Sequence, residues 1–152
     1  SRLSDFLRLT LERPIAPEIP LAEELEFVQR YLEIERIRFE ERLRISVDMP
    51  RDTEQALVPA LILQPLVENA IHHGIARCDD GGSIAIKATR EDGMLRLVFS
   101  DDVVCAPGVR ERVGLSNTRA RLQALYGQRH RFTYGPTGNG FAVEIAIPCS
   151  AR

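Results

Sequence analysis

Segments with helical periodicity alternate with segments in which every second residue is apolar, and this order constrains the fold most. The helix-like segments run from Leu21 to about Leu43, from Pro59 to about Ile75, and from Leu115 to Tyr126. The first helix-like segment is followed by a strand at Arg44–Met49, and the second by a hairpin around Gly93 that ends near Ser100. The third is followed by a last hairpin of Arg131–Tyr134 and Phe141–Ile147. This succession predicts an α+β fold, a two-layer α/β sandwich with a mixed sheet and helices on one face.

The first 43 residues predict a helical region ahead of the sheet. Ser1–Glu12 has apolar residues at helical spacing, and Pro14, Pro17 and Pro20 end that helix. The helix from Leu21 carries two apolar stripes, so one can pack on the following domain and the other on a partner helix. Burial of both stripes within one monomer is an equal alternative. We expect residues 1–43 to be a helical linker and residues 44–150 to be the main domain.

Composition narrows the class of protein. The net charge is -2 and the basic residues are scattered, which argues against nucleic-acid binding. Cys78, Cys105 and Cys149 are far apart and have no CxxC spacing, which argues against a disulfide framework or a zinc site and favours a reducing compartment. No apolar run approaches the roughly 18 residues of a membrane span, so we expect no membrane contact from this chain.

The stretch from Leu61 to Gly74 concentrates polar side chains on one edge of an apolar helix. Asn69 and His73 are four residues apart and share a stripe, while Gln64, Glu68 and His72 share the next. An amide oxygen suits Mg²⁺, and a neighbouring carboxylate can position or deprotonate a nucleophile. For a helix in general, a polar rim that binds no ligand is the more common alternative.

The amino-acid sequence of this stretch resembles a motif of a known protein family. Gln64-Pro-Leu-Val-Glu-Asn-Ala-Ile-His-His-Gly74 is similar to the N box of the LytS/YehU-type sensor histidine kinases, whose ATP-binding domain belongs to the GHKL superfamily. Leu21–Leu43 looks like the family's linker helix, Val113–Leu122 with Tyr126-Gly127 like its last nucleotide-binding box, and Gly138–Pro148 like its closing hairpin. The resemblance covers essentially the whole chain. It implies a Bergerat/GHKL sandwich in residues 44–150, preceded in residues 1–43 by the C-terminal part of the dimerisation and histidine-kinase region.

The resemblance also implies site residues. Asn69 matches the Mg²⁺ ligand, and Glu68 matches an acidic neighbour that helps to activate the attacking group, which makes it the candidate catalytic residue. His72 stands where the family has a Lys near the phosphates, His73 matches the family's His, and Asp101 matches the aspartate that binds the adenine amino group. The last box contributes the nucleotide-binding matches Gly114, Leu115 and Asn117, where N–H groups at a helix start can hold phosphate.

Two glycine-rich boxes of the family are altered here. The first reads Asp101-Asp102-Val103-Val104-Cys105, with Val103 and Cys105 at the glycine positions. A β-branched residue forced to positive φ costs about 1 to 2 kcal/mol, so we expect strain and weaker nucleotide binding. In the second box Arg110 and Arg112 replace glycines and only Gly114 remains. These arginines either lie in a solvated loop or contact phosphate or fill the site.

The function that the resemblance implies is the ATP-binding catalytic domain of a two-component sensor histidine kinase. None of the three histidines has the context of the family's phosphoacceptor, so the γ-phosphoryl group would pass to a histidine upstream of this fragment. The alternative is a degenerate signalling module, or pseudokinase, that acts through dimerisation and partner binding. The family further implies ATP and Mg²⁺ as ligands, a homodimer formed through N-terminal helices, and a LytTR-type response regulator as partner. It also implies a cytoplasmic domain of a protein anchored in the bacterial inner membrane.

Overall fold

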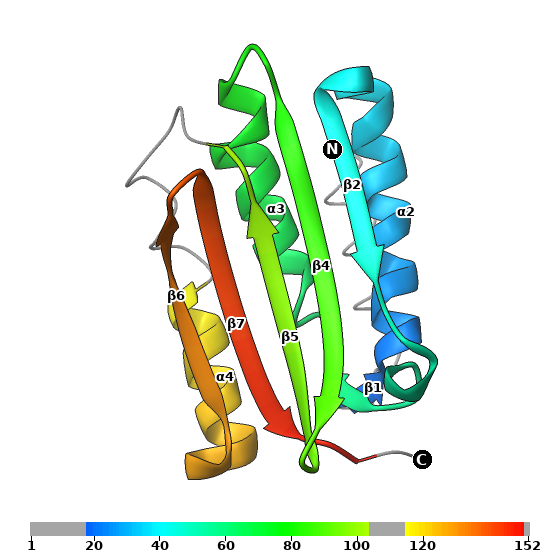
Figure 1. Ribbon diagram of the computed structural model, residues 1–152, viewed down its shortest axis with the longest axis vertical. Helices are drawn as coiled ribbons and strands as arrows, with labels where there is room; N and C mark the ends of the chain where they lie inside the picture. Colours follow the sequence, from blue (N-terminus) through cyan, green and yellow to red (C-terminus); the bar gives the residue numbers. More distant parts are fainter. Residues whose placement is uncertain (1–17, 104–114, 151–152) are drawn as a thin grey trace.

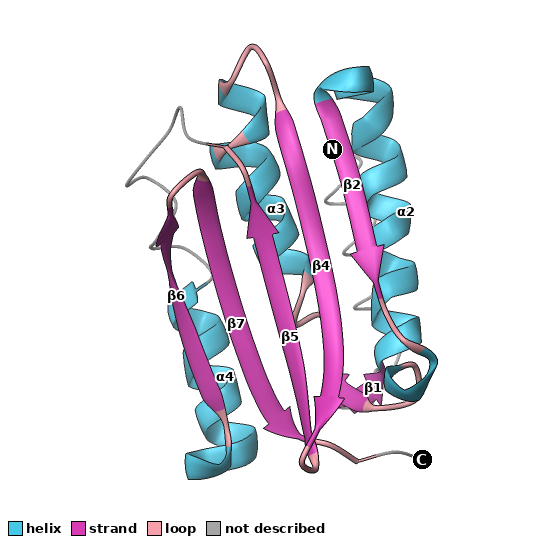
Figure 2. Cartoon of the chain, viewed as in Figure 1, coloured by secondary structure: helices cyan, strands magenta, loops and turns pink. Residues whose placement is uncertain are grey.

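The computed structural model describes residues 18–103 and 115–150, which form one sheet with helices on one of its faces (Figure 1, Figure 2). The sheet has the strand order β2-β4-β5-β7-β6, with β2 Leu43–Asp48, β4 Gly82–Glu91, β5 Met94–Asp101, β6 Arg131–Thr137 and β7 Gly140–Pro148. Strand β2 pairs with β4 in parallel, and the other neighbours pair antiparallel. The predicted α+β sandwich with a mixed sheet is therefore confirmed.

The helices that cover the sheet are α2 Leu21–Phe39, α3 Gln64–His73 and α4 Leu115–Tyr126. Short 3₁₀ turns occur at η1 Glu40–Arg42, η2 Arg51–Thr53, η3 Ile75–Arg77 and η4 Gly127–Arg129. A small second sheet pairs β1 Glu18–Pro20 with β3 Leu57–Pro59 in antiparallel fashion. The hydroxyl of Tyr126 in α4 donates to the Glu18 carboxylate at 2.8 Å, which ties the third helix to this small sheet.

Both apolar stripes of helix α2 contribute to the same core as the sheet, because Tyr31 and Phe39 of the second stripe are at most 4% exposed. Leu21, Leu25, Val28 and Leu32 are at most 2% exposed and belong to the main hydrophobic cluster, together with the buried faces of the sheet and of α3. The other side of α2 carries charged residues and the exposed Ile37. The division of the chain at residue 43 stays a prediction, and the helix predicted at Ser1–Glu12 lies outside the described residues.

The helix predicted from Pro59 begins five residues later than expected. Residues 57–59 form strand β3, and Leu61 has a φ of 63°, which interrupts any helix that begins before it. Helix α3 starts at Gln64, with Pro65 in its first turn, where the missing N–H of proline costs no hydrogen bond. The prediction of the start was wrong because an apolar run does not reveal whether it is strand, turn or helix.

Two further expectations concern the class of protein. Cys78 is buried and disulfide-bonded, which the spacing of the cysteines did not lead us to expect. Separation along the chain does not determine which cysteines approach one another in the fold. Among the described residues, no helix combines the length and the apolar character needed to cross a membrane.

Candidate functional site

Helix α3 carries most of the predicted site residues and has a clear inner face. Leu66, Val67, Ala70 and Ile71 are at most 3% exposed and pack into the core. Asn69 and His73 lie half-buried beside that face, whereas His72 is exposed. Packing of the apolar stripe therefore fixes the rotation of α3 and places the Asn69 and His73 stripe at the edge of the core.

Glu68, the candidate catalytic residue, is half-buried next to Gln64. The side-chain amide of Gln64 donates from Nε2 to Oε1 of Glu68 at 3.3 Å. Burial raises the pKa of the Glu68 carboxyl above its ordinary value, while the hydrogen bond from Gln64 and the charge of His72 act in the opposite direction. A carboxyl group whose pKa is raised in this way holds a proton more readily than an exposed glutamate.

Two side-chain atoms on α3 are buried without a hydrogen-bond partner among the described residues. They are Oε1 of Gln64, a residue that is 1% exposed, and Nδ1 of His73. Burial lowers the pKa of His73, and the positive charges of Arg77 and His72 lower it further. A neutral imidazole can donate or accept one hydrogen bond at each nitrogen, so His73 retains capacity for a ligand or a water molecule.

Asp101 closes strand β5 and is 7% exposed. Its Oδ1 atom accepts the backbone N–H of Val103 at 3.1 Å. Asp102, the next residue, links the end of β5 to the start of β4. Its N–H donates to the Ser83 carbonyl at 3.3 Å, and the Ser83 N–H donates to Asp102 Oδ1 at 2.6 Å. These bonds fix the backbone on which the Asp101 carboxylate is presented.

Val103 does not show the strain expected of a valine at a family glycine position. Positive φ among the described non-glycine residues occurs at Glu40, Leu61 and Asp92, so Val103 has an ordinary backbone conformation. Its side chain is 2% exposed and occupies space that Gly82 leaves open. The expectation of strain at Val103 was wrong because the valine turns into the core instead of adopting the glycine conformation, whereas weaker nucleotide binding stays a prediction. The other altered positions, Cys105, Arg110 and Arg112, lie outside the described residues.

The last predicted box is described from Leu115 onward, and Gly114 lies outside the described residues. Leu115 is buried at the start of α4, and Asn117 is exposed in the first turn. One turn further on, the Arg119 guanidinium lies over the rings of Phe132 and Tyr134, at 5.1 and 5.7 Å from their centroids. These contacts attach the first half of α4 to strand β6.

The fold brings the predicted residues of α3 and β5 to one end of the sheet. Figure 1 shows the C-terminal half of α3 and the end of β5 at this end. Gly82 links them, since a Cβ at Gly82 would meet Val103 at 2.5 Å and Ile75, just past α3, at 3.7 Å. An amide, an imidazole with an unpartnered buried nitrogen and a buried carboxylate thus share this end, a donor and acceptor set that fits a nucleotide with a metal ion.

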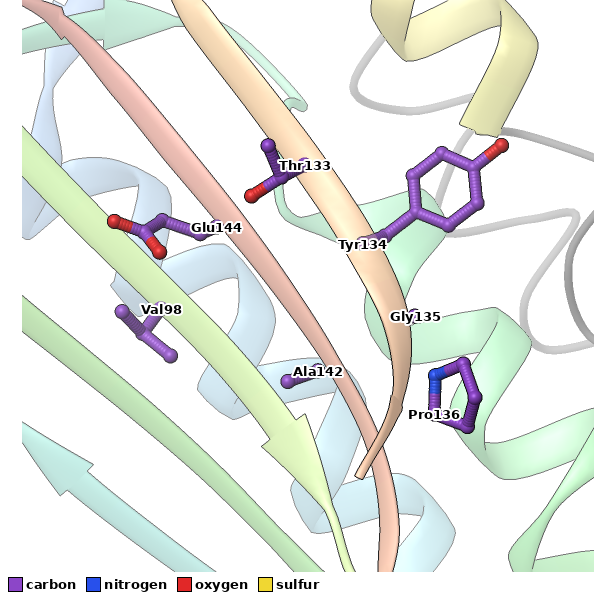
Figure 3. Close-up of a pocket in the computed structure, with 7 residues that line it drawn as sticks. All are labelled: Val98, Thr133, Tyr134, Gly135, Pro136, Ala142 and Glu144. Atoms are coloured by element: carbon purple, nitrogen blue, oxygen red, sulfur yellow. The ribbon is translucent and has the colours of Figure 1, made fainter. Parts of the chain in front are cut away.

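A separate shallow cavity of about 230 Å³ lies between β5, β6 and β7 (Figure 3). Its lining includes Val98, Thr133 and Glu144, while Tyr134 points away from them towards α4. None of the predicted site residues lines this cavity. The cavity is therefore distinct from the end of the sheet where Asp101 lies.

Two residues that contact the chain next to the predicted site residues were missed in the sequence. Glu24 is fully buried on α2, and its carboxylate contacts the chain just before α3. Its place in the apolar stripe, three residues after Leu21, was the available signal. Gly140 faces the backbone of Asp101 at a distance that no side chain allows. No local pattern identifies that approach, because the two residues are 39 positions apart.

A family model, curated proteins and solved structures that resemble this chain are described as histidine kinases or sensor proteins. A family model described as Histidine kinase matches residues 1–43. Sensor histidine kinase BtsS of Escherichia coli strain K12 is 42% identical over 82% of this chain, and the sensor protein LytS of Oceanobacillus iheyensis is 28% identical over 97%. The chain spans 22% and 28% of the lengths of these two relatives. The catalytic domain of the histidine kinase ThkA, a solved structure, has a TM-score of 0.65 at 14% identity, over 89% of this chain and 97% of that one.

Proposed function

The chain belongs to the family of LytS-type sensor histidine kinases, and from this premise we propose that residues 44–150 bind ATP with Mg²⁺ at the end of the sheet where α3 and β5 meet. The observation that carries the proposal is that the C-terminal half of α3, which bears Asn69 and His73, and the end of β5, which bears Asp101, lie at one end of the sheet. The unpartnered Nδ1 of His73 supports a ligand at this end. The pseudokinase alternative is not favoured, since the matched relatives are named as sensor histidine kinases.

In this proposal each side chain has a limited task. The amide oxygen of Asn69 binds the metal ion, and His72 and His73 face the phosphates. The Asp101 carboxylate accepts a hydrogen bond from the adenine amino group, for which it has acceptor capacity beyond its bond from Val103. The N–H groups in the first turn of α4, near Leu115 and Asn117, donate to phosphate oxygens.

The proposed chemistry is transfer of the γ-phosphoryl group to a histidine upstream of this fragment. Such a transfer depends on positioning and on neutralising charge more than on covalent chemistry by the protein. A bound magnesium ion would neutralise charge on the phosphate oxygens. Glu68 would take a proton from, or orient, the attacking imidazole, and its raised pKa makes it a better proton acceptor than an exposed carboxylate.

The wider setting is proposed on family grounds alone. The parent protein would form a homodimer through its N-terminal helices, with this part in the cytoplasm and an anchor in the inner membrane. A response regulator, of LytTR type by resemblance, would receive the phosphoryl group. Sedimentation of the purified chain would test the dimer directly, and a monomer at all concentrations would count against a contribution of residues 1–43 to it.

The test of the nucleotide site is calorimetric titration with ATP and Mg²⁺. Asn69→Ala should abolish saturable binding, because it removes the proposed metal ligand. Gln128→Ala is the control, since Gln128 is an exposed amide in η4, which follows the C-terminal end of α4 and is away from Leu115. Absence of heat at millimolar nucleotide from folded wild-type protein would refute the proposal, and equal binding by both variants would refute the role of Asn69.

A further inference from the structure

Glu24 is a fully buried acidic residue on α2, and its carboxylate is used by the backbone ahead of α3. Oε1 accepts the N–H of Leu61 at 2.8 Å, and Oε2 accepts the N–H of Leu63 at 2.9 Å. Two backbone donors from one short segment therefore converge on a single side chain of another helix.

These contacts define where α3 begins. Leu61 has a φ of 63°, a conformation that residues other than glycine rarely adopt and that here is stabilised by its hydrogen bond to Glu24. Leu63 is the residue before α3, and no side chain within α3 or at Leu63 caps the helix. The N–H of Leu63, the residue that caps α3, and the N–H of Leu61 before it are instead bound by the Glu24 side chain of α2. A carboxylate at this position also complements the positive end of the α3 dipole.

Backbone hydrogen bonds around Glu24 also connect the start of α2 with the segment before α3. Strand β1, which leads into α2, pairs with β3, which leads towards α3. The N–H of Leu21 donates to the Ala56 carbonyl at 2.8 Å, and the N–H of Ala22 donates to the Glu54 carbonyl at 2.9 Å. The first turn of α2 and the segment before α3 thus form one hydrogen-bonded joint, and Glu24 is its side-chain contact nearest to α3.

We infer that Glu24 is a positioning residue for the candidate nucleotide site, acting by fixing the start and the rotation of α3. Each helical residue turns the chain by about 100°, so a slip of one residue at Leu61–Leu63 would direct Asn69 and His73 away from the end of β5. This inference rests on the proposed function for its effect on nucleotide binding, whereas its effect on α3 does not depend on a ligand.

The surroundings of the Glu24 carboxyl oppose part of the effect of its burial. Burial raises the pKa of the Glu24 carboxyl, and this is opposed by the N–H groups of Leu63 and Leu61, by Arg121 on α4, and by the N–H of Gln64. A glutamine at this position would keep the volume but present one N–H₂ group to a backbone donor. The substitution Glu24→Gln therefore separates the acceptor function of the carboxylate from its packing.

The experiment compares Glu24→Gln with Glu23→Gln, which makes the same charge change at an exposed position one residue away. Circular dichroism establishes that both variants are folded, and amide exchange then follows Leu61, Leu63 and the α3 residues Asn69 and His73. For Glu24→Gln we expect exchange to rise at least about tenfold at Leu61 or Leu63 and at the α3 amides, the ratio expected for loss of one hydrogen bond to a charged group.

The same variants are titrated with ATP and Mg²⁺. Glu24→Gln should raise the Kd at least about tenfold, while Glu23→Gln should leave it unchanged, because loss of stability alone does not alter the Kd of folded protein. Equal Kd values for the two folded variants would overturn the inference. If Glu24→Gln does not fold, Glu24→Asp replaces it, and an unchanged Kd for that shortened carboxylate would overturn the inference equally.

Failure of the proposed function is distinguishable from failure of this inference. If the wild-type protein binds no nucleotide, the proposed function fails, and the amide exchange of α3 still decides the role of Glu24. In that case exchange at Asn69 and His73 that is the same in Glu24→Gln and Glu23→Gln would overturn the positioning role.

Discussion

Replacing Gly140 with alanine should separate the ends of β5 and β7. A Cβ at this position would lie 1.8 Å from the carbonyl oxygen of Asp101 and 2.7 Å from its carbonyl carbon. Carbon and carbonyl oxygen ordinarily approach no closer than about 3.3 Å, so the backbones must move apart by about 1.5 Å. Both atoms of Asp101 belong to the main chain of a central strand, so no side-chain rotation relieves the overlap.

The size of the effect follows from the two consequences of this movement. Overpacking within a well-packed region costs about 1 to 3 kcal/mol, and a backbone hydrogen bond lost at the end of the ladder adds about 1 kcal/mol. Gly140→Ala should therefore lower the free energy of unfolding by about 2 to 4 kcal/mol. Nucleotide binding should weaken as well, because the residue displaced is the proposed adenine acceptor.

Urea denaturation measures this effect, and the same hairpin supplies the control. Gly138 has no atom within 4 Å of an added Cβ and is not among the glycines with positive φ. Gly138→Ala should change the free energy of unfolding by no more than about 0.5 kcal/mol. If Gly140→Ala were as stable as Gly138→Ala, the close approach of β7 to Asp101 would not exist in solution and the reasoning would be refuted.

The remaining predictions concern the same end of the sheet. Gly82→Ala should destabilise by about 1 to 3 kcal/mol, because its Cβ would lie 2.5 Å from Val103 Cγ2. Val103→Ala in that background should recover part of the loss, and strictly additive effects in urea denaturation would contradict the contact. His73 should titrate below 6.5, because burial and then Arg77 lower its pKa, which an NMR titration can measure. Folding favours the neutral form of His73, so its contribution to the free energy of unfolding is complete above pH 6.5 and is lost as the pH falls through the lowered pKa. A pKa of His73 at or above 6.5 in the NMR titration would contradict this expectation.

Much of the fold was predictable because local signals agreed with it. The helix Leu115–Tyr126 was predicted with the limits that α4 has, and the glycine at position 93 correctly located the turn between β4 and β5. The last hairpin was predicted with too long a turn, since β6 continues to Thr137 and β7 begins at Gly140. Gly135 and Pro136 have the composition of a turn but lie in an edge strand, where proline is tolerated.

Features that depend on distant parts of the chain were not predictable in the same way. The parallel pairing of β2 with β4 and the β1–β3 sheet are set by tertiary packing, for which the sequence has no local signal. The start of α3 is fixed by Glu24, which is 37 residues before Leu61. The candidate site was predicted as a set of residues on α3 and β5, and its roles for ATP and Mg²⁺ stay predictions.

Within residues 18–103 and 115–150, the strand order leaves the sheet with two borders that pair with no further strand, β2 and β6. A free border offers unpaired N–H and C=O groups to any other extended chain and is a common starting point for aggregation. On β2 the exposed residues include Arg44 and Asp48, and β6 carries Arg131 and Pro136. A new strand would have to pack beside these charged side chains, and the proline offers no donor. The borders therefore discourage a second copy from extending the sheet, which keeps the five-stranded layer finite.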